Sequence, residues 1–143
     1  MYDTVKTIND TTQFINNRIY QKYHTLLDDN ITSAQDLLLT TIHNAEQITI
    51  SEIATKLNIS SSGASQQVSK LEDNNYVKRQ INPKNRREIL VSLAEKGTKY
   101  IHKQEKIEKI ITEKLYAKLG VEKLNDFKNI LLTLKKIVVK ELP

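Results

Sequence analysis

Residues that form tight turns are scarce in this chain, and their scarcity limits the folds open to it. Only 3 glycines and 2 prolines occur among 143 residues. Sandwiches and barrels need a turn after every short strand, and such turns depend on residues that accept positive φ or fix φ near −65°. We therefore expect a mainly α-helical protein. A chain of this length suits one compact domain with long helices.

Several functional classes are excluded by residues that the chain lacks. It contains no cysteine, which excludes disulfides, thiolate catalysis, iron–sulfur clusters and cysteine zinc sites. It has no Gly-rich phosphate loop and no Gly-x-Ser-x-Gly elbow, so we predict no enzymatic activity and no cofactor. No apolar run approaches the length of about 18 residues that spans a membrane. The opening MYDTVKTIND is not a secretory signal, and we expect a soluble, cytoplasmic protein.

Long helical patterns lie at both ends of the chain. Apolar residues at spacings of three and four predict a helix over residues 4–28, with one apolar face. Another helix is expected over residues 95–118, and Gly120 then stops it. The last helix carries a heptad-like apolar seam. The seam residues are Val121, Leu124, Phe127, Leu131, Leu134 and Val138.

Three shorter helices are predicted between the long ones, each opened by a hydroxyl side chain. Capping boxes at Thr32 and Thr49 open the first two, and one of the serines 60–62 caps the third. The third runs to about Asn74, where Asn74-Asn75 suits a left-handed helix end. The inward residues expected on the three helices are Ala34, Leu37, Leu38 and Ile42, then Ile53, Ala54 and Leu57, then Ala64, Val68 and Leu71.

Two short runs of β-forming residues follow, at 76–81 and 88–93. The turn residues 82–85, Asn-Pro-Lys-Asn, lie between them, so the pair predicts a β-hairpin. Three of the four arginines in the chain lie within residues 76–90, where Glu88 is the sole acidic residue. Arginine concentrated in one segment of a lysine-rich chain indicates that this segment needs the planar guanidinium geometry and not only positive charge. An ordinary solvated loop is the alternative.

In this order the helices and the basic hairpin make a winged helix-turn-helix. Its second short helix presents small polar side chains, and its N-terminal amides favour a phosphate. Glutamine can read an adenine edge, serine can bind phosphate or base, and lysine can neutralise phosphate. An arginine at the hairpin tip can enter a narrow, A·T-rich minor groove. The predicted DNA-binding residues are Ser61, Ser62, Ser65, Gln66, Gln67, Ser69, Lys70, Lys84, Arg86 and Arg87.

The same stretch resembles the MarR family of bacterial transcription regulators. The resemblance rests on ITSAQDLLL, ISEIATKLNISSSGASQQVSKLEDNNYVKR and NPKNRREILVSLAEKG, which fall within residues 31–97. Asn85 stands where the family carries an Asp two residues before the wing arginine, here Arg87, so the usual ion pair cannot form. Asn75 replaces the family glycine after the recognition helix, and Ala94 replaces the threonine that caps the next helix.

The resemblance implies a homodimeric, sequence-specific regulator of double-stranded DNA, most often a repressor released by a small-molecule effector. Family members interlock their terminal helices, so residues 1–30 and 95–143 are expected to dimerise and residues 31–94 to form the DNA-binding lobe. Packing inside a monomeric bundle is the alternative for these amphipathic helices. A small phenolic or anionic effector is a further expected partner. Its candidate contacts are Tyr20, Tyr23, His24 and His43, residue types that also serve as ordinary packing.

Two other functions stay open. A winged helix can serve protein contacts without binding DNA, although an interaction helix would be expected to expose aromatic or aliphatic anchors in place of glutamine and serine. A zinc-responsive regulator of the same fold is the second. His24, His43 and His102 do not form a local pair of ligands, and we predict no metal site.

Overall fold

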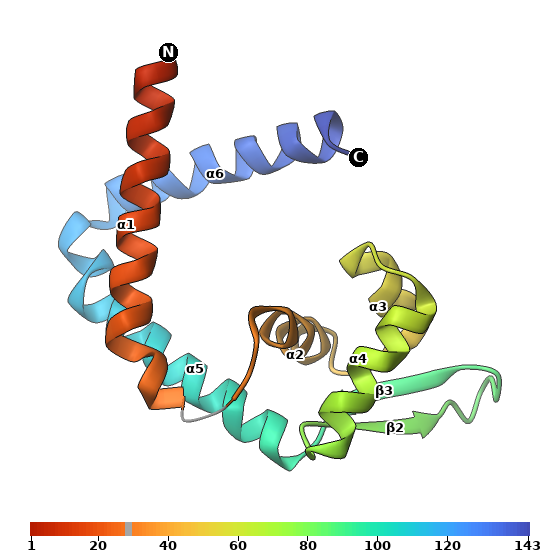
Figure 1. The fold of residues 1–143 in the computed structure, drawn as a ribbon. Helices are drawn as coiled ribbons and strands as arrows, with labels where there is room; N and C mark the ends of the chain where they lie inside the picture. The colour runs from red at the N-terminus through yellow and green to blue at the C-terminus, as the bar shows by residue number, and fades with distance from the viewer. Residues whose placement is uncertain (28–29) are drawn as a thin grey trace. The chain divides into compact units, whose positions relative to one another are not determined.

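The computed structural model describes residues 1–27 and 30–143 (Figure 1). These residues divide into two compact units, Met1–Gln104 and Glu105–Pro143. The expected mainly α-helical fold with a small β-structure is confirmed. Its elements are α1 (Tyr2–Leu27), α2 (Ser33–Ala45), β1 (Ile48–Thr49), α3 (Ile50–Leu57), α4 (Ser61–Asp73), β2 (Val77–Ile81), β3 (Ile89–Leu93), α5 (Glu95–Lys114), the 3₁₀ turn η1 (Tyr116–Leu119) and α6 (Val121–Glu141). The helix end predicted near residue 28 falls at the edge of the described residues, because residues 28–29 lie outside them.

Side-chain caps begin the three short helices as the sequence predicts. Thr32 forms a full capping box, in which its hydroxyl accepts from the Gln35 amide at 3.2 Å while the Gln35 side chain accepts from the Thr32 amide at 2.9 Å. Thr49 caps α3. The structure selects Ser60 from the three serines before α4, because its hydroxyl accepts from the backbone amide of residue 63 at 3.0 Å. Each cap satisfies an amide that the helix cannot.

The predicted hairpin is confirmed, and a third strand joins it. β2 and β3 pair antiparallel from Val77↔Leu93 to Ile81↔Ile89. The third strand, β1, was not predicted; it pairs with the other edge of β3 and gives the sheet order β1-β3-β2. A two-residue strand is too short to show alternation in sequence. Its second residue, Thr49, also caps α3, so that helix starts at the edge of the sheet.

The core confirms the inward faces of α3 and α4 and corrects that of α2. Leu38 and Ile42 are buried as expected, but Leu37 is 55% exposed and Ala34 is exposed too. Leu39, which the pattern left outside, is fully buried. The prediction for Ala34 and Leu37 was wrong because α2 contacts both α3 and β3, and this two-sided contact turns neighbouring positions inward.

Close backbone contacts join the start of α5 to the residues that follow α4. The carbonyl of Tyr76 accepts from the Ala94 amide at 2.9 Å, and the carbonyl of Asn75 accepts from the Lys96 amide at 3.1 Å. The second bond satisfies a first-turn amide although Ala94 brings no capping hydroxyl. A Cβ on Gly97 would lie 2.1 Å from the Tyr76 carbonyl oxygen, so only glycine fits here. Asn75 has φ of 62°, the left-handed conformation expected at this helix end.

The second unit is a helical arm with little burial of its own. The single helix expected over residues 95–118 is interrupted, since α5 ends at Lys114 and η1 follows it. The predicted stop at Gly120 is confirmed by its φ of 85°. No residue of α6 is buried, and the same holds for the described α1 in the first unit. Among the described helices, none has the length and apolar character that crossing a membrane requires.

The contact at Gly97 generates a stability prediction. Gly97→Ala should lower the free energy of unfolding by about 1–3 kcal/mol, because the new methyl group meets backbone that no rotamer change can move. Gly63→Ala is the matched control. Its methyl group would meet only the Ser60 hydroxyl, at 3.0 Å, and should change stability by less than about 1 kcal/mol. Chemical denaturation followed by circular dichroism measures both; equal stability of the two variants would contradict the prediction.

Candidate nucleic-acid interface

Helix α4 is held against the core by one face and leaves a polar face outside. Its buried residues are Ala64, Val68 and Leu71, one turn apart along the helix. That burial fixes the rotation of α4 about its axis. The predicted DNA-binding residues Ser61, Ser62, Gln66 and Lys70 are exposed, whereas Ser65, Gln67 and Ser69 are half-buried.

The half-buried serines of α4 are bound by an arginine that the sequence analysis did not select. Arg79 lies on β2, and its Nη2 donates to the Ser65 carbonyl at 2.6 Å, to the Ser65 hydroxyl at 3.2 Å and to the Ser69 hydroxyl at 2.9 Å. The available signal was alternation, since Arg79 lies two residues after the buried Val77 and so shares its face of the strand. An arginine at such a position has to find partners inside the protein.

The turn of the hairpin, residues 82–88, carries three of the predicted DNA-binding cations. Lys84, Arg86 and Arg87 are all exposed there. Asn82 organises the turn, because its Oδ1 accepts from the Lys84 amide at 3.0 Å and its Nδ2 donates to the Glu88 carboxylate at 3.1 Å. The exposed cations therefore extend from a turn whose backbone is tied at several points.

Asn85 replaces the ion pair of the wing with a different brace. Its Oδ1 accepts from the backbone amide of Arg87 at 3.2 Å. This bond orders the peptide of Arg87, while the guanidinium stays free of an acidic partner at position 85. The side chain of Arg87 is therefore held at its base and extends into solvent.

The predicted effector residues lie on two helices. Tyr20 and His24 stack on α1 with ring centroids 4.7 Å apart, and His24 Nδ1 lies 2.8 Å from the Tyr20 carbonyl oxygen. Tyr23 is half-buried on the same helix. His43 lies near the end of α2, where it lines a shallow hollow together with Gln47 and other residues.

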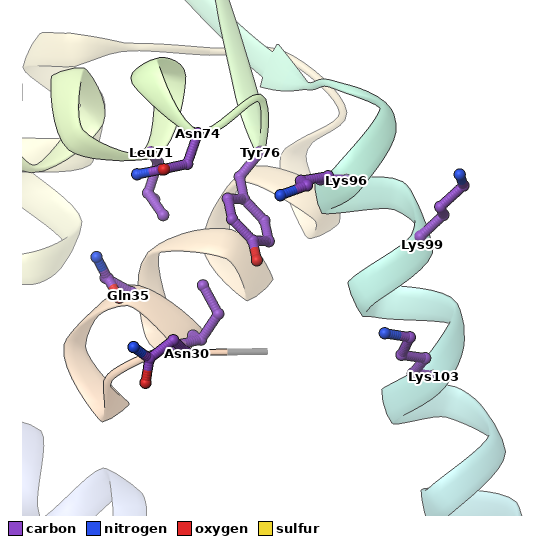
Figure 2. A pocket seen from close by; sticks show the side chains of 9 residues that line it. Asn30, Gln35, Leu71, Asn74, Tyr76, Lys96, Lys99 and Lys103 are labelled. Atoms are coloured by element: carbon purple, nitrogen blue, oxygen red, sulfur yellow. The ribbon is translucent and has the colours of Figure 1, made fainter. Parts of the chain in front are cut away.

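A deeper hollow lies elsewhere in the first unit, and none of the predicted effector residues lines it. Figure 2 shows it between α2, the end of α4 and the first turns of α5, with a volume of about 560 Å³. Lys96, Lys99 and Lys103 form its α5 wall. The ammonium of Lys96 lies 5.6 Å from the centre of the Tyr76 ring, and Lys103 donates to the Leu27 carbonyl at 2.8 Å.

No metal site forms from the three histidines or any other residues in the described ranges. A search of residues 1–27 and 30–143 finds no cluster of three His, Asp or Glu side chains that could hold an ion.

Comparison with known proteins places the polar helix and basic hairpin in a family. The model of the MarR family matches residues 31–89, from just before the Thr32 cap to the first residue of β3. This part of the chain, residues 31–89, is therefore similar to a MarR-family domain. In the winged helix-turn-helix fold, α3 and α4 form the helix-turn-helix, with α4 in the position called the recognition helix, and β2 and β3 form the wing, whose second strand continues past the match to Leu93. A search of curated protein sequences gave no match.

Several solved structures share the fold of nearly the whole chain. FabT of Streptococcus pneumoniae, solved in complex with DNA, is 18% identical with a TM-score of 0.81 and covers 98% of this chain and 99% of its own. A MarR family protein from Bacillus stearothermophilus is 20% identical, with a TM-score of 0.72 and coverage of 97% and 98%. A MepR mutant from S. aureus bound to an oligodeoxyribonucleotide is 20% identical, with a TM-score of 0.64 and coverage of 92% and 97%.

Proposed function

We propose that the protein is a homodimeric transcriptional regulator that binds a specific sequence in double-stranded DNA. The observation that carries the proposal is the exposed polar face of α4 beside a basic wing. Gln66 can form paired hydrogen bonds to an adenine edge, and the neighbouring lysine and arginine side chains can neutralise phosphates. The DNA-bound structures of FabT and MepR support this use of the same fold. A role on genomic DNA belongs in the cytoplasm of a bacterium.

Exposed apolar residues on α1 and α6 support the proposed homodimer. Phe127, Leu131 and Leu134 are each about half exposed on α6, and Ile8 and Ile15 on α1 are comparably exposed. An apolar surface of this extent on a single chain indicates an interface, because exposure to water costs about 25 cal/mol for each Å² of apolar area. A symmetric dimer would cover such helices with their own copies.

Release by an effector is the regulatory part of the proposal. The hollow of Figure 2 adjoins both the last turn of the recognition helix, through Leu71 and Asn74, and the α5 helix that leads to the arm. A small anion among its three lysines would contact the end of the recognition helix and the first turns of α5 together. Repression, with the effector lowering the affinity for DNA, is the mode that we propose.

The proposed function predicts a division of labour within the interface. Gln66→Ala and Gln67→Ala should each weaken binding to a selected operator by about 1–3 kcal/mol and change binding to unrelated DNA little, since they remove base contacts. Lys70→Ala and Lys84→Ala should weaken binding to both DNAs, since phosphate carries no base information. Anisotropy titrations of labelled duplexes measure this, with Gln21→Ala on α1 as the control.

Two results would count against that division. Equal weakening of operator and unrelated DNA by the glutamine variants would remove base reading from α4. Wild-type protein whose affinity for duplex DNA does not fall with added salt would contradict DNA binding altogether, because neutralised phosphates release counterions. That second outcome would favour the protein-contact module.

The wing generates a second prediction. Arg87→Ala should reduce operator binding most where the flanking DNA is A·T-rich, because a narrow minor groove concentrates negative potential on an inserted arginine. Arg86→Ala, which alters the adjacent cation of the same turn, should reduce binding to all flanks alike. Titrations across duplexes of graded A·T content separate the two. An Arg87→Ala protein with wild-type affinity for every flank would remove the wing from recognition.

The arm generates a third prediction. Leu131→Asp should convert the dimer into monomer or aggregate, because a carboxylate would have to be buried in an apolar seam. Asn125→Asp is the control, since it adds the same charge at a polar position of α6 and should leave the dimer intact. Sedimentation equilibrium at micromolar concentration gives the masses. A wild-type protein that sediments as a folded monomer would contradict the homodimer.

A further inference from the structure

Arg79 occupies an unusual place for a charged side chain. It lies on β2 opposite Val91, on the face of the strand that also carries the buried Val77. Its Nε is buried and has no hydrogen-bond partner in the described part of the chain. Placing a guanidinium here costs free energy that an apolar side chain would not. A specific role for the charge or for the fork of donors would explain why it is tolerated.

The bonds of Arg79 join the wing to the recognition helix along one face of α4. Its side chain binds Ser65 and Ser69, while its backbone amide donates to the Glu72 carboxylate at 3.0 Å. Ser65, Ser69 and Glu72 are four and then three residues apart, so they lie in line on the helix. β2 is an edge strand, and Glu72 therefore covers an amide of its open side. One residue thus fixes α4 against the wing at three successive turns.

These bonds also determine which serine can still donate. A serine hydroxyl has one proton. The hydroxyl of Ser69 donates that proton to the Ser65 carbonyl at 2.9 Å and accepts from Arg79. The hydroxyl of Ser65 accepts from Arg79, which leaves its own proton for an acceptor outside the protein. Ser65 is thereby oriented as a donor, and Ser69 serves as part of its support.

We propose that Arg79 is a positioning residue for DNA recognition. It holds α4 and the wing in one register and presents the Ser65 hydroxyl as a hydrogen-bond donor to an acceptor atom of DNA. The inference rests on the proposed DNA binding. The inference assigns Ser69 a supporting role, bound to Arg79, whereas the sequence pattern predicts that Ser69 contacts DNA. It also assigns a role in recognition to Arg79, which makes no DNA contact itself.

The test compares affinities for a duplex selected from random sequence by the wild-type protein and for an unrelated duplex of equal length. Arg79→Met should lower affinity for the selected duplex roughly tenfold and for the unrelated duplex by less than about twofold. The dependence of affinity on salt should not change, because no phosphate contact is lost. Arg79→Lys should behave like Arg79→Met, because the lysine side chain is one atom shorter and its ammonium stops short of the position from which Nη2 bonds Ser65 and Ser69.

Lys78→Met is the matched control, because it removes the same charge from the neighbouring, exposed position of β2. It should leave the ratio of the two affinities unchanged. Thermal unfolding establishes whether each variant is folded. If Arg79→Met does not fold, Ser69→Ala decides instead, since it removes one acceptor of the guanidinium and should lower the ratio severalfold.

Four results would overturn the inference. An unchanged ratio in folded Arg79→Met, or in folded Ser69→Ala where Arg79→Met does not fold, would show that the contact does not position the recognition helix. Wild-type affinity of Arg79→Lys for the selected duplex would show that a positive charge at this position is sufficient for recognition. A salt dependence reduced by about one phosphate in Arg79→Met would make Arg79 a direct contact. A wild-type protein that selects no duplex would refute the proposed function itself, and the inference with it.

Discussion

Burial of one face of the recognition helix is the constraint on which the rest of this structure depends. Ala64, Val68 and Leu71 are at most 1% exposed, so any rotation of α4 would bring apolar area into water. Full burial of the valine and leucine side chains is worth about 1.5–3 kcal/mol each. This packing, and no feature of the polar residues, decides that Gln66 and Lys70 lie outside. The candidate interface is therefore a consequence of the core.

Features set by short stretches of sequence could be predicted, and features set by distant contacts could not. The caps at Thr32 and Thr49 and the helix end at Asn75 each depend on a few neighbouring residues, and the structure has all three. The strand β1 exists only because β3 offers it an edge. The burial of Leu39 likewise depends on elements that close around α2 from two sides.

The same difference separates the parts of the candidate site. Types of side chain and their order identified α4 and the wing as the polar and basic elements. What the order could not show is that the guanidinium of Arg79 reaches back to Ser65 and Ser69. From sequence alone, a serine on the polar face of a helix is predicted to be a free hydrogen-bond donor. Only the packed structure shows that its hydroxyl is already bound from the side.

Asn85 and Arg79 show two ways in which an arginine of the hairpin is ordered. Asn85 binds the peptide of Arg87, whose side chain is exposed, so binding to DNA would have to order that side chain at a cost of up to about 2 kcal/mol of conformational entropy. Arg79 is already bonded to α4, so its ordering is complete before DNA arrives. An exposed arginine can adapt to grooves of differing width, whereas a bonded one holds the helix that is proposed to read bases. The proposed regulator would thus combine a tolerant wing with a rigid recognition helix, and its sequence preference would come mainly from α4.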